Sequence, residues 1–364
     1  MRPPAGAALF CLLLICSQIG PSRACTSFCL DTPDGPVFAA NLDLFLGEGL
    51  VFVNRRGIAK ENIRQSTTGE TAKWVSEYGS VTFNLAGRGF AWGGMNEAGL
   101  VVSSMELRAS EYPEPDERAP FDSGSWIQYV LDTCGSVREA IQIDSIVRLH
   151  DDEHSPTPFL VADADGDCAA FEYLDGRFVC YTDESLPVKA LANAPYAAGI
   201  AFMEQGVIPA ENPGRSVERV AAAANKIESF RPDRGVSPVD YSLGVLTETV
   251  VAPKSFWSDW FDEPYTRWNV VFDIGRREAH FRTVASPTVR RLSLRSFDLS
   301  CEAPLLMMDV NAELEGDVQR SFTPYDHDVN LEVFRTFCDK WGIEVSAEGA
   351  IELMRFFESF RCAR

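Results

Sequence analysis

The chain has 364 residues, of which 46% are hydrophobic and 24% are charged, and its formal net charge at neutral pH is −20. This is the composition of an ordinary globular protein, long enough for one large α+β domain or two small ones. The strong negative charge argues against nucleic acid or an anionic membrane surface as a partner.

Residues 1–24 have the pattern of a secretion signal. Arg2 precedes the apolar block "AALFCLLLIC", and Ser22 and Ala24 are small residues at the two positions that a signal peptidase reads. The block is too short to cross a membrane as a helix, although an uncleaved anchor or a buried helix is the alternative. We expect cleavage after Ala24, without lipidation, and a secreted or periplasmic protein that begins with Cys25 and has no membrane partner.

A cysteine at the start of the mature chain would combine a nucleophile and a base in one residue. A thiol attacks carbonyls as the thiolate, and an ordinary cysteine, with a pKa of about 8.5, is mostly protonated at neutral pH. A free α-amino group has a pKa of about 7.7 to 8.0, so it can accept the thiol proton. The cut that exports the protein would then also activate Cys25.

Short apolar or alternating runs bounded by turn residues predict a strand-rich chain. These runs are residues 35–45, 49–57, 79–85, 87–94, 99–107, 157–167, 168–182 and 266–283. Helices are expected at 125–134, at 136–142 with a capping box from Ser136 to Glu139, and at 214–230. The acidic, proline-rich residues 112–120 predict a loop, either near a site or a plain connector.

Two further helices are expected at the end of the chain, at 329–341 and 349–361. In the second, apolar side chains repeat at helical spacing, and we expect them to be core residues: Ile351, Met354, Phe357 and Phe360. The cluster "HDDEH" at 150–154 could suggest a metal, but the following Ser-Pro favours a solvated loop, so we expect no metal site.

Eight of the ten cysteines remain after signal cleavage, and if Cys25 is free, seven are left, which cannot all pair within one chain. Cys168 and Cys180 flank a predicted hairpin. With Asp175-Gly176 as its two-residue turn, Cys180 lies opposite Phe171, so the two sulfur atoms point to opposite faces and should not bond. The disulfide pairing is otherwise open.

Five segments resemble, in order, the choloylglycine hydrolase family of N-terminal-cysteine amidases, which includes penicillin V acylases and conjugated bile salt hydrolases. They are "CTSFCLDTPDGPVFAANLDLF", "GGMNEAGLVVSSMEL", "ALANAPY", "NPGRSVERVA" and "YTRWNVVFD", and the likeness spans residues 25 to about 285. The resemblance implies an α+β fold, the four-layer αββα sandwich of the Ntn (N-terminal nucleophile) hydrolases. We expect one domain, 25–364, with a helical C-terminal segment from about residue 325.

The resemblance also implies roles for individual residues. Cys25 would be nucleophile and, through its amine, base, and Asp43 would hold the amine and thiol by a charge-assisted hydrogen bond. Asn193 would donate to the oxyanion, and Arg215 would fix the electrostatic environment of the cysteine. Asn96 matches a recurrent turn near the substrate region and is expected to be structural rather than catalytic.

Two positions depart from the family pattern. Ala40 stands where relatives carry an arginine, and Glu106 stands where relatives place a second oxyanion donor; a carboxylate there would repel an oxyanion unless it is protonated or turned away. We expect a cofactor-free hydrolase of linear amides, with a small-molecule amide as substrate. The alternative is a secreted binding protein without turnover. The substrate stays open among penicillin V, conjugated bile salts, N-acyl homoserine lactones and other N-acyl amines, as does a homo-oligomeric state.

Overall fold

The structure is a computed structural model that describes residues 25–150, 157–212, 215–252 and 265–363. The predicted secretion signal and most of the acidic cluster at 150–154 lie outside these ranges. Within them, no helix is long and apolar enough to span a bilayer.

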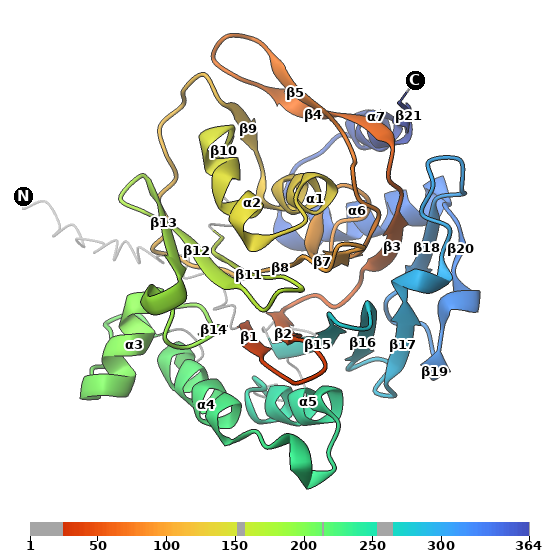
Figure 1. Cartoon of the computed structure of the whole chain (residues 1–364). Coiled ribbons are helices and arrows are strands. Elements are labelled where there is room, and N and C mark those ends of the chain that lie inside the picture. Colours follow the sequence, from red (N-terminus) through yellow and green to blue (C-terminus); the bar gives the residue numbers. More distant parts are fainter. Residues whose placement is uncertain (1–24, 151–156, 213–214, 253–264, 364) are drawn as a thin grey trace, which may run out of the picture.

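Two large sheets form the centre of the molecule (Figure 1). The seven-stranded sheet has the order β14-β1-β2-β15-β16-β17-β19, with bounds Ala190–Leu191, Thr26–Leu30, Val37–Leu44, Tyr265–Asp273, Glu278–Thr283, Arg290–Ser293 and Gly316–Asp317. The nine-stranded sheet has the order β13-β12-β11-β8-β7-β6-β3-β18-β20, with bounds Arg177–Thr182, Cys168–Leu174, Phe159–Ala162, Val101–Ser104, Ala91–Asn96, Ser80–Asn84, Leu50–Asn54, Leu306–Asp309 and Thr323–Pro324.

Helices cover the outer face of each sheet (Figure 1). On the seven-stranded sheet, α4 (Ser216–Ser229) and α5 (Pro238–Glu248) pack against β1, β2 and β15, and α3 (Tyr196–Gln205) packs against α4. On the nine-stranded sheet, α1 (Ser123–Thr133) packs against β7 and β8, and α2 (Val137–Gln142) follows it in the chain. The order helix, sheet, sheet, helix is the expected four-layer αββα sandwich.

The main hydrophobic core lies between the two sheets, where Phe83 makes edge contacts with both Phe272 and Phe281. A second core joins α1 to the nine-stranded sheet, and a third joins α4 and α5 to the seven-stranded sheet. Strand β2 therefore has core on both faces, and all eight of its residues are buried. Its two polar members, Asn41 and Asp43, must find partners inside the protein, because an unpaired buried polar group is costly.

Smaller elements complete the chain. Strands β4 (Ile58–Gln65) and β5 (Thr71–Val75) form a ribbon with β21 (Arg361–Cys362), and β9 (Ala119–Phe121) pairs with β10 (Val147–Leu149). Helices α6 (His327–Trp341) and α7 (Ala347–Glu358) pack on each other and form a small core with Ala86 and Phe90.

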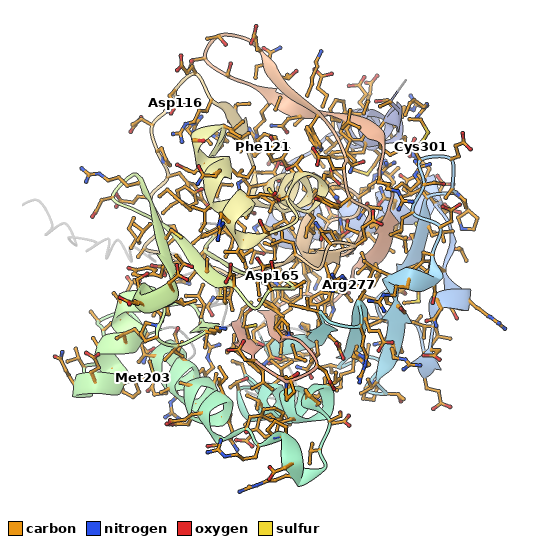
Figure 2. All side chains as sticks on the ribbon, viewed as in Figure 1. Asp116, Phe121, Asp165, Met203, Arg277 and Cys301 are labelled. Atoms are coloured by element: carbon orange, nitrogen blue, oxygen red, sulfur yellow. A yellow bond between two sulfur atoms is a disulfide. The ribbon has the colours of Figure 1, made fainter. Side chains whose placement is uncertain are left out.

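A disulfide fastens the C-terminal end of the chain. Cys301, labelled in Figure 2, bonds to Cys362 in β21. The sequence left this pairing open. Cys168 and Cys180 are free, and Phe171 lies opposite Cys180, as the two-residue turn predicted. The turn residues Asp175 and Gly176 have φ of 51° and 69°, the left-handed values that such a turn requires.

The predicted helices are present, with small shifts at their ends. Ser136 accepts a hydrogen bond from the Glu139 N–H, but the Glu139 carboxylate accepts from Gly135 instead of Ser136, so the expected capping box is half formed. Residues 112–118 form the expected loop, which leads into β9. Helices α3 and α5 had no counterpart in the sequence prediction.

Candidate active site

Strands β1 and β2 bring Cys25 and Asp43 together at the edge of the main core. The two strands pair antiparallel, with Thr26 opposite Asn41. The backbone N–H of Asp43 donates to Sγ of Cys25 at 3.4 Å, and the thiol faces the Asp43 carbonyl oxygen at 4.0 Å. Thr266 of β15 donates its hydroxyl to Oδ1 of Asp43. The other carboxylate oxygen, Oδ2, is buried and accepts no hydrogen bond from the described residues.

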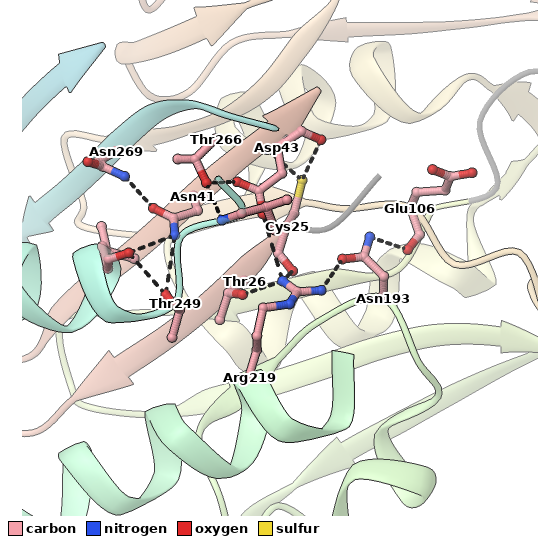
Figure 3. Close-up of polar contacts among 12 residues, drawn as sticks. Cys25, Thr26, Asn41, Asp43, Glu106, Asn193, Arg219, Thr249, Thr266 and Asn269 are labelled. Carbon is pink, nitrogen blue, oxygen red and sulfur yellow. Dashed lines mark hydrogen bonds and ion pairs between the residues drawn. The ribbon is translucent and has the colours of Figure 1, made fainter. Parts of the chain in front are cut away.

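Arg219, on the buried face of α4, connects the residues around Cys25 (Figure 3). Its Nη1 donates to the Cys25 carbonyl oxygen at 2.7 Å and to the Thr26 hydroxyl at 2.5 Å, and lies 3.8 Å from Oδ2 of Asp43. Its Nη2 donates to Oδ1 of Asn193 at 3.1 Å. One guanidinium thus contacts four residues of the site.

Burial dominates the electrostatics of this site. It raises the pKa of the Cys25 thiol to about 12, the negative charge of Asp43 adds to this rise, and the positive charge of Arg219 opposes it. Burial also raises the pKa of Asp43 to about 7, against the opposing effects of Arg219 and Thr266. With Cys25 still joined to the preceding residue, its thiol is therefore protonated at neutral pH and needs a further base to react.

Asn193 and Glu106 extend the site away from the thiol. Asn193 lies between β14 and α3, and its Nδ2 donates to the Glu106 carbonyl oxygen at 2.7 Å. Because the side-chain amide nitrogen carries two N–H groups, the second is still available for another acceptor. Figure 3 shows the run of contacts from Cys25 through Arg219 and Asn193 to Glu106.

The structure does not bring Arg215 to the site, so its expected electrostatic role at the cysteine is corrected. Arg215 precedes α4, its side chain is 81% exposed, and it pairs with Glu218 at 3.5 Å. Arg219, one helical turn later, takes the place that was expected for it. The sequence held a signal for this: Ser216, Arg219, Val220 and Ala223 share the buried face of the helix, where an arginine is unusual.

Two other positions have structural surroundings. Asn96 ends β7 and makes four hydrogen bonds within the fold, donating to the Leu131 and Cys134 carbonyls and accepting from Gly99 and Leu100. It does not line the cavity at Cys25. Ala40 is fully buried between the sheets, and the cation that acts on the thiol comes from α4 instead of β2.

A cavity of about 510 Å³ opens at Cys25. This volume lies within the range of pockets that take a drug-sized molecule. One wall is aromatic and apolar, and α6 and α7 supply much of it: Phe90, Trp92, Phe334, Phe337, Trp341, Leu353 and Phe357. Phe357, expected only as a core residue, is buried and also lines this cavity. Polar residues gather elsewhere on the wall: Asn62, Arg64, Glu106, Asp122, Ser123 and Ser125.

The described parts of the chain contain no group of three or more His, Cys, Asp or Glu side chains that could hold a metal ion. The functional groups gathered around Cys25 are its thiol, the carboxylate of Asp43, the guanidinium of Arg219 and the side-chain amide of Asn193.

The chain is similar to known amide hydrolases in sequence. The family of linear amide C–N hydrolases called the choloylglycine hydrolase family matches residues 25–205. The penicillin V acylase of Pectobacterium atrosepticum is 25% identical, with 77% of this chain and 83% of that protein covered.

Solved structures show the same fold. The penicillin V acylase of Agrobacterium tumefaciens superposes with a TM-score of 0.68 at 23% identity, covering 83% of this chain and 98% of the other. A mutant of the conjugated bile acid hydrolase of Clostridium perfringens gives a TM-score of 0.63 at 12% identity, covering 83% and 96%. Residues 25–205 of this chain thus match the choloylglycine hydrolase family, and the chain is an amidohydrolase that acts on linear amide C–N bonds.

Proposed function

We propose that the protein is a secreted amidase whose nucleophile is Cys25, set free at the N-terminus by signal cleavage, and whose substrate is an N-acyl amine with a large apolar acyl group. The observation that carries this proposal is the contact of Cys25 with Asp43 and Arg219 at one end of a cavity with an aromatic wall.

Cleavage before Cys25 would supply the missing base. The new α-amine accepts the thiol proton, and the resulting ammonium is stabilised by the buried Oδ2 of Asp43, which has no hydrogen-bond donor among the described residues. The positive charge also favours the thiolate, so the pKa of Cys25 falls from the high value that burial gives it in the uncleaved chain.

The thiolate then attacks the amide carbonyl, and the developing oxyanion accepts a hydrogen bond from the second N–H of Asn193. Such a donor contributes most when it is held in place before the reaction, and the bonds of Asn193 to Arg219 and Glu106 do this. The intermediate collapses to a thioester as the α-ammonium protonates the leaving amine. Water, deprotonated by the same amine, attacks the thioester and releases the acid.

The aromatic wall favours an acyl group with a long aliphatic or aromatic body. Phe337 stacks on Trp341 with ring centroids 4.6 Å apart, and Trp341 contacts Phe45 at 5.0 Å. Burying an apolar chain here is favourable by about 25 cal/mol per Å² of area removed from water. Penicillin V, bile-acid amides and long-chain N-acyl homoserine lactones all have such an acyl body.

The proposal is tested by labelling the secreted protein with iodoacetamide between pH 6 and 7. We expect an intact mass that begins at Cys25 and carries no lipid, and labelling of Cys25 at least about tenfold faster than a free thiol. Peptide mapping separates Cys25 from the other cysteines. A slow reaction of Cys25, or a mature chain that begins before it, would contradict the proposed nucleophile.

Replacing Phe337 by alanine should lower kcat/KM for an N-decanoyl amide by about tenfold, mainly through KM, because it removes apolar contact with the acyl chain. The matched N-acetyl amide does not reach this wall, so its kcat/KM should change less than about twofold. Phe337→Leu restores most of the side-chain volume and should recover most of kcat/KM for the N-decanoyl amide. Equal losses for both amides would place the acyl group elsewhere.

A further inference from the structure

We propose that Glu106 makes the enzyme select amides whose amine portion is uncharged or cationic, and reject those whose amine portion carries a carboxylate or sulfonate close to the scissile bond. The inference rests on the proposed function, because it assigns the charge of the leaving group in that reaction.

The backbone of Glu106 is held close to the reacting atoms. Its carbonyl oxygen accepts from Nδ2 of Asn193 at 2.7 Å, Asn193 accepts from Arg219 at 3.1 Å, and Arg219 donates to the Cys25 carbonyl oxygen at 2.7 Å. Two residues therefore separate Glu106 from Cys25 along a continuous line of hydrogen bonds. This holds the backbone of Glu106 at the site, where the residue lines the cavity.

The carboxylate of Glu106 is part of the cavity wall and is mostly shielded from water. The side chain is 13% exposed, whereas that of its ion-pair partner Arg108, 3.6 Å away, is 34% exposed. The negative charge thus lies deeper than the positive charge that balances it. Solvent screens Arg108 more than Glu106, so a substrate inside the cavity meets a net negative potential here. The same charge helps to raise the pKa of Cys25.

The other acidic groups that line the cavity have close partners of their own. Asp43 has Arg219 at 3.8 Å and the Thr266 hydroxyl on Oδ1. Asp122 caps α1, with its carboxylate accepting from the N–H and the hydroxyl of Ser125. The cavity-lining residue of opposite sign is Arg64 in β4, which could attract an anionic substrate and is therefore included in the test.

An anionic leaving amine would bring a second negative charge toward Glu106 in a cavity with little water, and like charges in such a place are strongly unfavourable. A neutral amine meets no such repulsion, and an ammonium group gains attraction. Discrimination by a repulsive group needs no contact with the favoured substrate. Glu106 would therefore act as a specificity-determining residue without taking part in bond cleavage.

Three amides with one acyl group test this: N-decanoyl-glycine, N-decanoyl-glycinamide and N-decanoyl-ethylenediamine, which differ in the charge of the amine portion. In the wild-type protein we expect kcat/KM for the neutral amide to exceed that for the anionic amide at least about tenfold. In Glu106→Gln this ratio should fall to about twofold or less. In Arg108→Gln, which removes the counter-charge, the ratio should increase. Glu114→Gln changes the net charge equally at an exposed position and should leave the ratio as in the wild type.

The outcomes separate this inference from the proposed function. Hydrolysis of none of the three amides, with no reaction of Cys25 toward iodoacetamide, would contradict the proposed function itself. Hydrolysis of the neutral and anionic amides at equal rates would overturn the role of Glu106 alone. A preference for the anionic amide that disappears in Arg64→Gln would also overturn it and would assign the recognition of the amine to Arg64.

Discussion

Replacing Cys25 by serine is expected to lower kcat/KM for an N-acyl amide by at least about 10³-fold, because a hydroxyl is far harder for an amine to deprotonate than a thiol. The fold should be little affected. The serine hydroxyl can accept from the Asp43 N–H and donate to the Asp43 carbonyl, as the thiol is placed to do. Initial rates with N-decanoyl-glycinamide and a thermal melt measure the two effects separately.

Cys180→Ser is the matched control, since Cys180 is a free, half-buried cysteine on β13, away from the cavity. Its rate should stay within about twofold of the wild type. Comparable loss of activity in both variants, or hydrolysis by Cys25→Ser at a wild-type rate, would show that the thiol of Cys25 is not the nucleophile.

A variant that retains one residue before Cys25 isolates the contribution of the α-amine. Its thiol is present, but the nitrogen of Cys25 is a peptide nitrogen and cannot accept a proton. Burial then keeps the pKa of the thiol at about 12, as in the uncleaved chain. We expect hydrolysis to be abolished and iodoacetamide labelling to slow, while the melting temperature stays close to that of the mature protein.

The sequence predicted the parts of the fold that local rules determine. The turn at Asp175-Gly176 sets the register of its hairpin, because a two-residue turn leaves one pairing for the flanking strands. Helix α5 was missed although Ser237 caps it and Pro238 opens it, both of which are helix-start signals. Helix α3 has no such signal, since Pro195 precedes it and no side chain caps it.

Contacts between distant segments could not be predicted in the same way. The bond of Cys301 to Cys362 depends on how the C-terminal segment packs against the rest of the fold, and seven candidate cysteines left the pairing open. The aromatic wall of the cavity likewise depends on contacts between segments that are far apart in the sequence. Helical spacing correctly indicated that Met354 and Phe357 face inward, but not that their helix, α7, would line the cavity at Cys25.

Residue type and spacing predicted some of the residues that the structure brings together at the site and one that it does not. Cys25 was predicted from the expected signal cleavage and Asp43 from the resemblance, and the pairing of the adjacent strands β1 and β2 brings the two residues together. Arg215 and Arg219 both lie in the segment that resembles the family, and the choice between them depends on where α4 begins. An error of one turn moves a guanidinium from the buried site to the surface.

Replacing Arg219 by alanine is therefore expected to lower both the stability and the activity of the protein. The change leaves Asp43 buried without its cation, and loss of one partner of a buried ion pair costs about 3–5 kcal/mol of the free energy of unfolding. It also frees Asn193 and the Cys25 backbone, so kcat/KM should fall by at least about 10²-fold.

Arg219→Lys separates the loss of charge from the loss of geometry. A lysine keeps the positive charge near Asp43, but it lacks the planar fork that contacts the Cys25 carbonyl, Thr26 and Asn193 together. It should recover much of the stability and little of the activity. Arg215→Ala is the matched control: its side chain is exposed, so stability should change by less than about 0.5 kcal/mol and kcat/KM by less than about twofold. Urea unfolding measures the stability of the three variants, and initial rates measure their activity. A larger loss of activity in Arg215→Ala than in Arg219→Ala would show that Arg215, as the sequence predicted, is the residue that acts on Cys25.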